Sequence, residues 1–144
     1  MASKILVGID GSEASQRAVN FAEQQAKAGS SQLVVAYVIE WSPYTFNTPE
    51  ENEQRYKRRE EEIALAQERF LNPLLEQLKN NNVDADGLIR HGQPAKTLNA
   101  IAQEEQVDQI IVGRQGQSGF KEMLFGSVAG NLVQTADVPV TFVP

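Results

Sequence analysis

The chain alternates short apolar runs with longer segments in which apolar residues recur every three or four positions. The apolar runs are typical of strands, and we expect five of them: residues 4–9, 33–39, 83–91, 109–113 and 138–143. The run 33–39 is apolar at every position, as expected when helices cover both faces of a parallel sheet. The periodic segments between the runs predict helices, so the expected order is βαβαβαβαβ.

Capping residues mark the expected ends of the shorter helices. The first helix is expected between Ser12, which suits an N-cap, and Gly29, which suits a C-terminus. Its apolar face is Ala14, Ala18, Phe21, Ala22 and Ala26. Pro94 suits the first turn of a later helix that runs to about Glu105, with the inner face Ala95, Leu98, Ile101 and Ala102. Ser127 suits the cap of the last helix, whose apolar stripe is Val128, Leu132, Val133 and Ala136.

A long helix is expected to begin in the very polar stretch 50–62 and to end at the asparagines 80–82. Pro73 lies inside its apolar pattern, where a proline removes one backbone hydrogen bond and clashes with the carbonyl oxygen of Arg69. We therefore expect a kink near Pro73. The residues expected to face the core are Ile63, Ala66, Phe70, Leu74 and Leu78.

Alternation of this kind predicts an α/β fold, a five-stranded parallel doubly wound sheet with helices on both faces. The length of 144 residues suits one domain, which we expect to span residues 1–144. The first and fourth strands both end in the pattern Val-Gly-x-x-Gly, whose first glycine is Gly8 in one and Gly113 in the other. Ligands of doubly wound sheets bind beyond the carboxyl ends of the strands where the winding reverses, so the two similar ends predict a shared site.

The loop after the fourth strand is the most distinctive pattern in the chain. It reads Gly113-Arg114-Gln115-Gly116, then nine residues, then Gly126-Ser127. Glycines let backbone N–H groups converge on an anion, and the N-terminus of the helix that follows favours a phosphate. Neither the Walker pattern with its lysine nor the dinucleotide fingerprint is present, so the loop predicts an anion site of another kind.

This spacing resembles that of the nucleotide-binding members of the universal stress protein family, which carry Gly-x2-Gly-x9-Gly-Ser or Gly-Thr. The resemblance covers the whole chain, through the start 4–12, the Gly-Gln-Pro at 92–94 and the segment 136–140. It implies a Rossmann-like fold of the adenine nucleotide alpha hydrolase-like type and binding of ATP. A typical member has an acidic residue where Gln93 stands, a departure at a helix start that is not expected to affect nucleotide binding.

The resemblance also implies roles for individual residues. Positions around the adenine and ribose are matched by Gly8, Asp10 and Val38, with Val38 offering backbone groups to the base. Positions beside the ribose and α-phosphate are matched by Val112 and Gly113. The phosphate-cradling positions are matched by Gly116, Gly126, Ser127 and Val128. Further candidates in the same loop are Arg114, Gln117 and Ser118. Asp10 is also the candidate ligand, directly or through water, for Mg²⁺ or Mn²⁺, because ATP entering a protein of net charge −6 needs its phosphates neutralised.

Composition excludes several other kinds of site. Lys and Arg number 13 against 19 Asp and Glu, the wrong balance for a binder of nucleic-acid backbones. The absence of cysteine excludes disulfides, thiolate zinc sites and cysteine nucleophiles. No apolar stretch is long enough to span a bilayer, so we expect no membrane insertion and a cytoplasmic protein. We expect structural roles for His91, for the basic run 57–59 and for the aromatic residues Trp41, Tyr44 and Phe46.

The apolar strand from Val138 to Val143 is expected at a sheet edge, which proteins normally protect from free pairing. Family members commonly dimerise through this strand, so the resemblance implies a homodimer. Pro139 cannot donate to such a ladder, and we expect it to limit the register.

Three functions stay open. The first is a nucleotide-responsive regulatory module with an unidentified protein partner, in which ATP, AMP or a cyclic nucleotide is bound and little is hydrolysed. The second is a slow ATPase or a phosphoryl or nucleotidyl transferase, for which Asp10 and Arg114 are the only charged groups clearly placed to help. The third is an interaction scaffold that binds no nucleotide. The sequence favours the first.

Overall fold

The computed structural model describes residues 3–40, 48–114 and 127–144. Its elements are, in order, β1 (Lys4–Ile9), α1 (Glu13–Gly29), β2 (Gln32–Glu40), α2 (Pro49–Ala66), the π-helical turn η1 (Gln67–Leu71), α3 (Asn72–Asn80), β3 (Ala85–Gly92), α4 (Pro94–Glu105), β4 (Gln109–Gly113), α5 (Ser127–Thr135) and β5 (Val140–Val143). The expectations for Trp41, Tyr44 and Phe46 fall outside the described residues.

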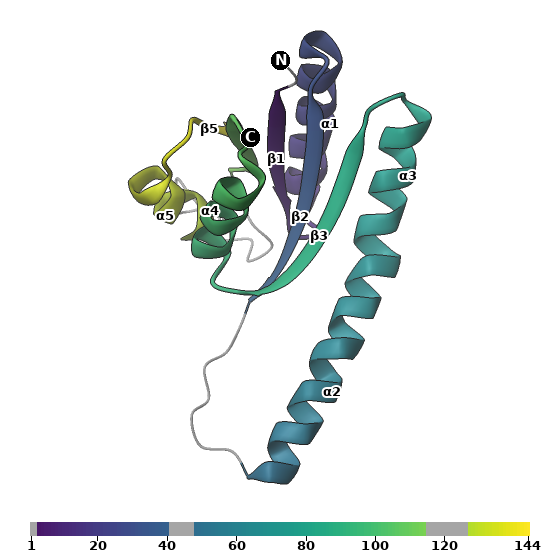
Figure 1. Cartoon of the computed structure of the whole chain (residues 1–144), viewed down its shortest axis with the longest axis vertical. Coiled ribbons are helices and arrows are strands. Elements are labelled where there is room, and N and C mark those ends of the chain that lie inside the picture. Colours follow the sequence, from purple (N-terminus) through teal and green to yellow (C-terminus); the bar gives the residue numbers. More distant parts are fainter. Residues whose placement is uncertain (1–2, 41–47, 115–126) are drawn as a thin grey trace.

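The five strands form one sheet in the order β3-β2-β1-β4-β5, and all four pairings are parallel. The chain winds outward from β1 to β3, returns to the other side of β1, and continues outward through β4 to β5 (Figure 1). The predicted doubly wound α/β fold is therefore confirmed, and the winding reverses between β1 and β4, where the sequence predicted it.

Alternation along the strands divides the core into two layers. The elements α2, η1 and α3 follow one another without a break and form one long rod. On one face of the sheet, Ile5, Val7 and Ile9 of β1 pack with apolar residues of α1 and of this α2–α3 rod. On the other face, Leu6 packs with the inner residues of α4 and with Leu132 of α5. Figure 1 shows α4 and α5 on one side of the sheet and α1 and α3 on the other. This arrangement explains why the central strands are apolar at every position.

The first helix begins and ends by local hydrogen bonds. Ser12 is the N-cap, as predicted, and its hydroxyl oxygen accepts from the N–H of Ser15 at 3.1 Å. Gly29 is the last helical residue, and the left-handed residue that ends the helix is Ser30, at φ 53°. The helix therefore ends at Gly29, as predicted, although the left-handed position is taken by the next residue and not by the glycine.

The long helix continues through Pro73, and its irregularity is the π-helical turn η1, which lies just before that residue. The N–H of Asn72 bonds to the carbonyl of Gln67, five residues back. The wider turn changes which side of the helix upstream faces the sheet. Ile63, expected in the core, is 37% exposed. Glu62 instead is hydrogen-bonded to Nε2 of His91, at 3.2 Å.

The last helix and strand also depart from the expected pattern. Val133, expected on the apolar stripe of α5, is 60% exposed, whereas Ala129 and Leu132 are buried. The side of α5 that packs on the core is centred on Val128 and Leu132, with Ala136 just past the helix end, and Val133 lies at its edge, about 100° around the helix from Leu132. The strand β5 begins at Val140, two residues later than expected.

Backbone bonds show which way β5 presents its polar groups. The carbonyls of Pro139 and Val143 accept from the N–H groups of Ile110 and Arg114, at 2.9 and 2.7 Å. These two carbonyls therefore face β4, and by alternation the peptide groups of Val140 and Phe142 face away from it. The missing N–H of Pro139 lies on the β4 side, so its absence takes no donor from the outer edge; its effect on the register of a dimer stays a prediction.

Among residues 3–40, 48–114 and 127–144, no helix combines the length and apolar character needed to cross a membrane.

Candidate functional site

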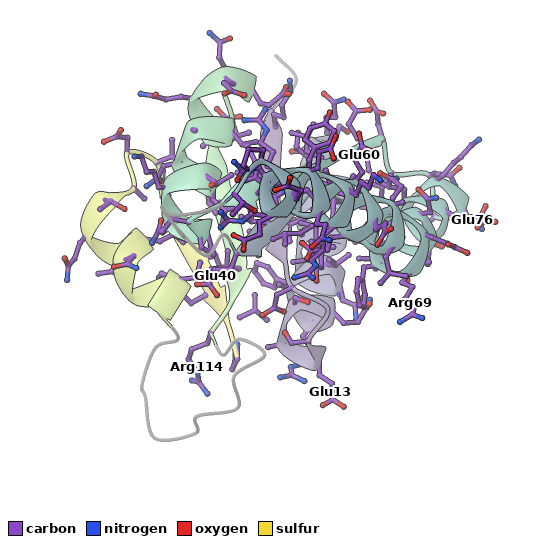
Figure 2. All side chains as sticks on the ribbon, turned by 90° about the horizontal axis from the view of Figure 1, so that it is seen from below. Glu13, Glu40, Glu60, Arg69, Glu76 and Arg114 are labelled. Carbon is purple, nitrogen blue, oxygen red and sulfur yellow. The ribbon has the colours of Figure 1, made fainter. Side chains whose placement is uncertain are left out.

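A cavity of about 300 Å³ opens beyond the carboxyl ends of β1, β2 and β4, at the point where the winding reverses. Its walls also include the first turn of α4 and the first turn of α5. Figure 2 looks onto this end of the molecule and labels Glu40 and Arg114, which both line the cavity. This is where doubly wound sheets bind their ligands.

Seven of the residues predicted for the site line this cavity: Gly8, Asp10, Val38, Val112, Gly113, Arg114 and Val128. The predictions for Gly116, Gln117, Ser118 and Gly126 fall outside the described residues. Ser127 begins α5, and its side chain is also outside the description. The lining residues that sequence reasoning missed are Ile9, Ser15, Ala36, Tyr37, Ile39, Glu40, Pro94, Leu98 and Ala129.

Gly8 at the end of β1 and Gly113 at the end of β4 are each restricted by the packing of different neighbours. A Cβ on Gly8 would lie 3.1 Å from Cδ1 of Leu98 and 3.2 Å from Cγ1 of Val112, both of which line the cavity. A Cβ on Gly113 would lie 2.9 Å from the carbonyl carbon of Ala14, in α1. Gly113 is therefore required by the packing of α1 against β4, whatever the cavity holds.

Asp10 is held in a tight turn between β1 and α1. Its Oδ1 accepts from the N–H of Ser12 at 2.9 Å, and Gly11 between them has φ 81°. Ser15, a buried polar residue of the cavity wall, donates from its hydroxyl to the carbonyl of Ser12 at 2.9 Å. These bonds fix the Asp10 carboxylate at the start of α1, on the wall of the cavity.

Tyr37 forms the wall next to Asp10. Burial raises the pKa of Tyr37 above its ordinary value, and the negative charge of Asp10 raises it further. The hydroxyl therefore stays protonated at neutral pH and is able to donate a hydrogen bond. The ring of Tyr37 is stacked on that of Phe70, with centroids 5.4 Å apart and planes 8° apart.

The strand β2 extends past β1 and presents backbone groups to the cavity. The N–H of Gln32 donates to Ser3 on the β1 side, and the N–H of Leu33 donates to Asp84 on the β3 side. By this alternation the peptide groups of Val38 face the β1 side. The pairing of β2 with β1 ends at Tyr37, opposite Ile9. The carbonyl of Val38 therefore faces the space beyond β1, where the cavity lies.

Residues expected to be structural lie outside the cavity lining. His91 is paired with Glu62 and joins β3 to α2. Gln93 is the N-cap of α4, and its side-chain oxygen accepts from the N–H of Lys96 at 2.6 Å. An amide oxygen caps this helix as a carboxylate would, so Gln93 performs the helix-start role expected from the sequence.

Asp10 fits a site for a divalent cation only if the ligand supplies further oxygens. Across the described parts of the chain, no three or more His, Asp and Glu side chains gather closely enough to hold a metal. Mg²⁺ is commonly held by one or two carboxylates together with the phosphates of a nucleotide. The donor set of the cavity therefore fits a cation that arrives with a phosphorylated ligand.

A parallel doubly wound sheet with a cavity at its switch point gives the molecule an α/β fold of Rossmann-like topology. The family model described as "Universal stress protein family" matches residues 1–144, and the chain belongs to this family.

Relatives and solved structures agree with this assignment. Universal stress protein YxiE of Bacillus subtilis is 31% identical over 152 residues, which cover 99% of each chain. The structure of universal stress protein UspA from Lactobacillus plantarum superposes with a TM-score of 0.87, at 24% identity and with 99% and 97% of the two chains covered. A universal stress protein solved in complex with cAMP has a TM-score of 0.64 and is 26% identical, with 99% and 96% covered.

Proposed function

We propose that this protein binds an adenine nucleotide, ATP in particular, in the cavity beyond β1, β2 and β4. We propose further that it acts as a nucleotide-responsive regulatory module of the cytoplasm and not as an efficient enzyme. The observation that carries the proposal is the cavity itself, which joins an apolar middle to polar ends at the switch point of the sheet.

The apolar middle of the cavity suits a purine. Ala36, Val38 and Leu98 line it, and a flat base between such side chains is removed from water on both faces. The carbonyl of Val38, facing the space beyond β1, is an acceptor for the exocyclic amine of adenine. Guanine presents a carbonyl at the same position, so this acceptor favours adenine.

The polar end of the cavity suits phosphates. Arg114 stands at the end of β4, and α5 begins at Ser127, so a cationic side chain and a helix N-terminus flank the opening. We assign the phosphate-cradling role to Gly116, Gly126, Ser127 and Val128, with Gln117 and Ser118 as further candidates, on the spacing of the loop. Asp10 would hold Mg²⁺ or Mn²⁺ together with those phosphates.

The comparison that supports this ligand class is the universal stress protein solved with cAMP, since cAMP is an adenine nucleotide. Among the described lining residues the titratable side chains are Asp10, Tyr37, Glu40 and Arg114, and we expect binding to prevail over turnover because this set lacks the lysine that P-loop enzymes place on the phosphates. A slow ATPase is the alternative, and the experiment below separates the two.

The protein should be purified without added ligand and denatured, and any released nucleotide identified by chromatography and mass spectrometry. The emptied protein should then be titrated with ATP, AMP, cAMP and GTP, with and without Mg²⁺, while phosphate release is followed. We expect an adenine nucleotide near one per chain and negligible turnover. Recovery of no nucleotide together with no binding would refute the proposal and leave an interaction scaffold.

Two variants sharpen this test. Gly116→Val should weaken binding of ATP, whereas Gly130→Ala, also in the last third of the chain, should leave it unchanged because no atom of the described residues outside its own helix turn lies within 4 Å of a Cβ there. Rapid phosphate release that Asp10→Ala abolishes would establish an enzyme instead.

A further inference from the structure

The turn that carries Asp10 rests on an aromatic ring from the long helix. Gly11, the residue after Asp10, has φ 81°, and a Cβ built on it would lie 3.0–3.3 Å from three ring atoms of Phe70. The ring therefore packs directly against the backbone of the turn. Phe70 lines a groove beside the cavity, and it is not itself part of the cavity lining.

The same ring also supports the neighbouring wall of the cavity. Phe70 and Tyr37 are stacked nearly parallel, with centroids 5.4 Å apart. Tyr37 lies opposite Ile9 in the sheet, and Ile9 is the residue before Asp10. One side chain therefore contacts both the backbone next to Asp10 and the ring beside it, from an element far away in the sequence.

The π-helical turn accounts for the position of Phe70. It spans Gln67–Leu71 and brings Leu71 into full burial, at 1% exposure, with Phe70 next to it on the side of the β1 end. Such turns are rare and are frequently found at functional sites, because they aim a side chain where a regular helix cannot. Phe70 is the aromatic residue that this turn carries.

We propose that Phe70 is a positioning residue of the nucleotide site, which holds Asp10 in place through Gly11 and Tyr37. The inference rests on the proposed function. Under the proposed function Asp10 lies beside the ribose and would also hold the cation together with the phosphates, so loss of the ring should weaken binding of Mg-ATP more than binding of adenosine, which brings neither phosphate nor cation.

The test compares two ligands on one variant. Phe70→Leu keeps an apolar side chain but removes the ring. By calorimetry well below the unfolding temperature, we expect its affinity for Mg-ATP to fall about tenfold, the usual effect of removing a residue that orients a metal ligand. Its affinity for adenosine, which has no phosphate and brings no cation, should fall clearly less. The near-ultraviolet circular dichroism of tyrosine should change in the empty protein, because the stack with Tyr37 is lost.

Leu74→Val is the matched control. Leu74 lies one turn further along the rod, packs against the same core layer and lines the same groove as Phe70. We expect it to lower stability without separating the two ligands. A loss of Mg-ATP affinity equal to that of Phe70→Leu would show a merely structural effect and overturn the inference.

A double-mutant cycle with Asp10→Asn completes the test. If Phe70 acts through Asp10, then Phe70→Leu has little further effect on Mg-ATP binding once the carboxylate is gone. Additive losses would contradict the proposal, as would equal losses for adenosine and Mg-ATP. If the wild-type protein binds neither ligand, the proposed function itself fails; if it binds Mg-ATP and Phe70→Leu binds it equally well, only this inference fails.

Discussion

Individual glycines in this molecule have different structural roles, which depend on the atoms that a side chain at each position would contact. At Gly113 a methyl group would press on the backbone of Ala14, whereas at Gly130, in α5, it would meet nothing within 4 Å. The first glycine permits a helix to approach a strand closely, and the second only adds backbone freedom to a helix. The two positions therefore predict opposite effects of the same substitution.

We expect Gly113→Ala to lower the free energy of unfolding by about 1–3 kcal/mol, because backbone atoms of α1 must move. Gly130→Ala should raise it by about 0.5–1 kcal/mol, the difference between the two residues inside a helix. Denaturant unfolding of the three proteins, fitted with a common slope, measures both changes. A neutral Gly113→Ala would mean that the contact with Ala14 is not formed in solution.

At the scale of elements, β3 and α4 are tied by a two-bond ion pair on the surface. Arg90 donates from Nη1 and Nη2 to the two carboxylate oxygens of Glu104, at 3.1 and 2.6 Å. The hydrogen bond from Arg90 lowers the pKa of Glu104 below its ordinary value of 4.5. The same hydrogen bond, donated by Arg90 to Glu104, raises the pKa of Arg90.

A lowered carboxyl pKa fixes the direction of the pH effect. The stabilisation by the pair is complete above pH 4.5 and is lost as the pH falls through the lowered pKa of Glu104. We therefore expect Glu104→Gln to unfold at a slightly lower denaturant concentration than wild type at pH 7, and the difference to shrink in acid. Arg90→Gln should remove the same pH dependence. A difference that grows as the pH falls would contradict this assignment.

The sequence allowed correct predictions where neighbouring residues along the chain determine the structure. It gave no signal where the structure depends on contacts between distant segments. Ser12, Gly8 and Asp10 could be located because a strand followed by a turn and a cap has a local pattern. Ile63 was misplaced because the π-helical turn changes the helical face upstream of it, and no residue signals that turn by itself. The contact of Phe70 with Gly11 joins residues far apart in the chain, so no spacing could predict it.

The candidate site was predictable to a similar extent. Its strand-end residues follow from the topology, because parallel strands end at one edge of the sheet. Leu98, a helix residue of the wall, was expected only as core, and Ala129 was not singled out at all. Their place in the cavity depends on how far α4 and α5 extend past the strand ends, which is set by packing in the whole sheet.

For the whole molecule, the cavity and one edge of the sheet are joined through β5. The N–H of Arg114, at the cavity, donates to the carbonyl of Val143, and Nε of Arg17 donates to the carbonyl of Pro144 at 2.8 Å. These bonds hold the end of β5 against β4 and α1. They leave the outward peptide group of Val140 at the edge, where it would suit the antiparallel pairing with a second copy of the chain that the expected homodimer requires.

A homodimer through β5 therefore predicts a specific sensitivity to proline. Val140→Pro removes an N–H that faces outward and takes no bond from the ladder to β4, a position at which edge strands tolerate proline. Because the axis repeats each bond, two hydrogen bonds of about 1 kcal/mol each are lost, and the dimer dissociation constant should rise at least about tenfold. Sedimentation at several concentrations measures this, with circular dichroism to verify the fold.

Pro139→Ala is the control variant, because it restores an N–H on the side that faces β4 and should leave the dissociation constant unchanged. If Val140→Pro associates as strongly as wild type, or if wild type is monomeric at high concentration, then β5 is not the dimer interface.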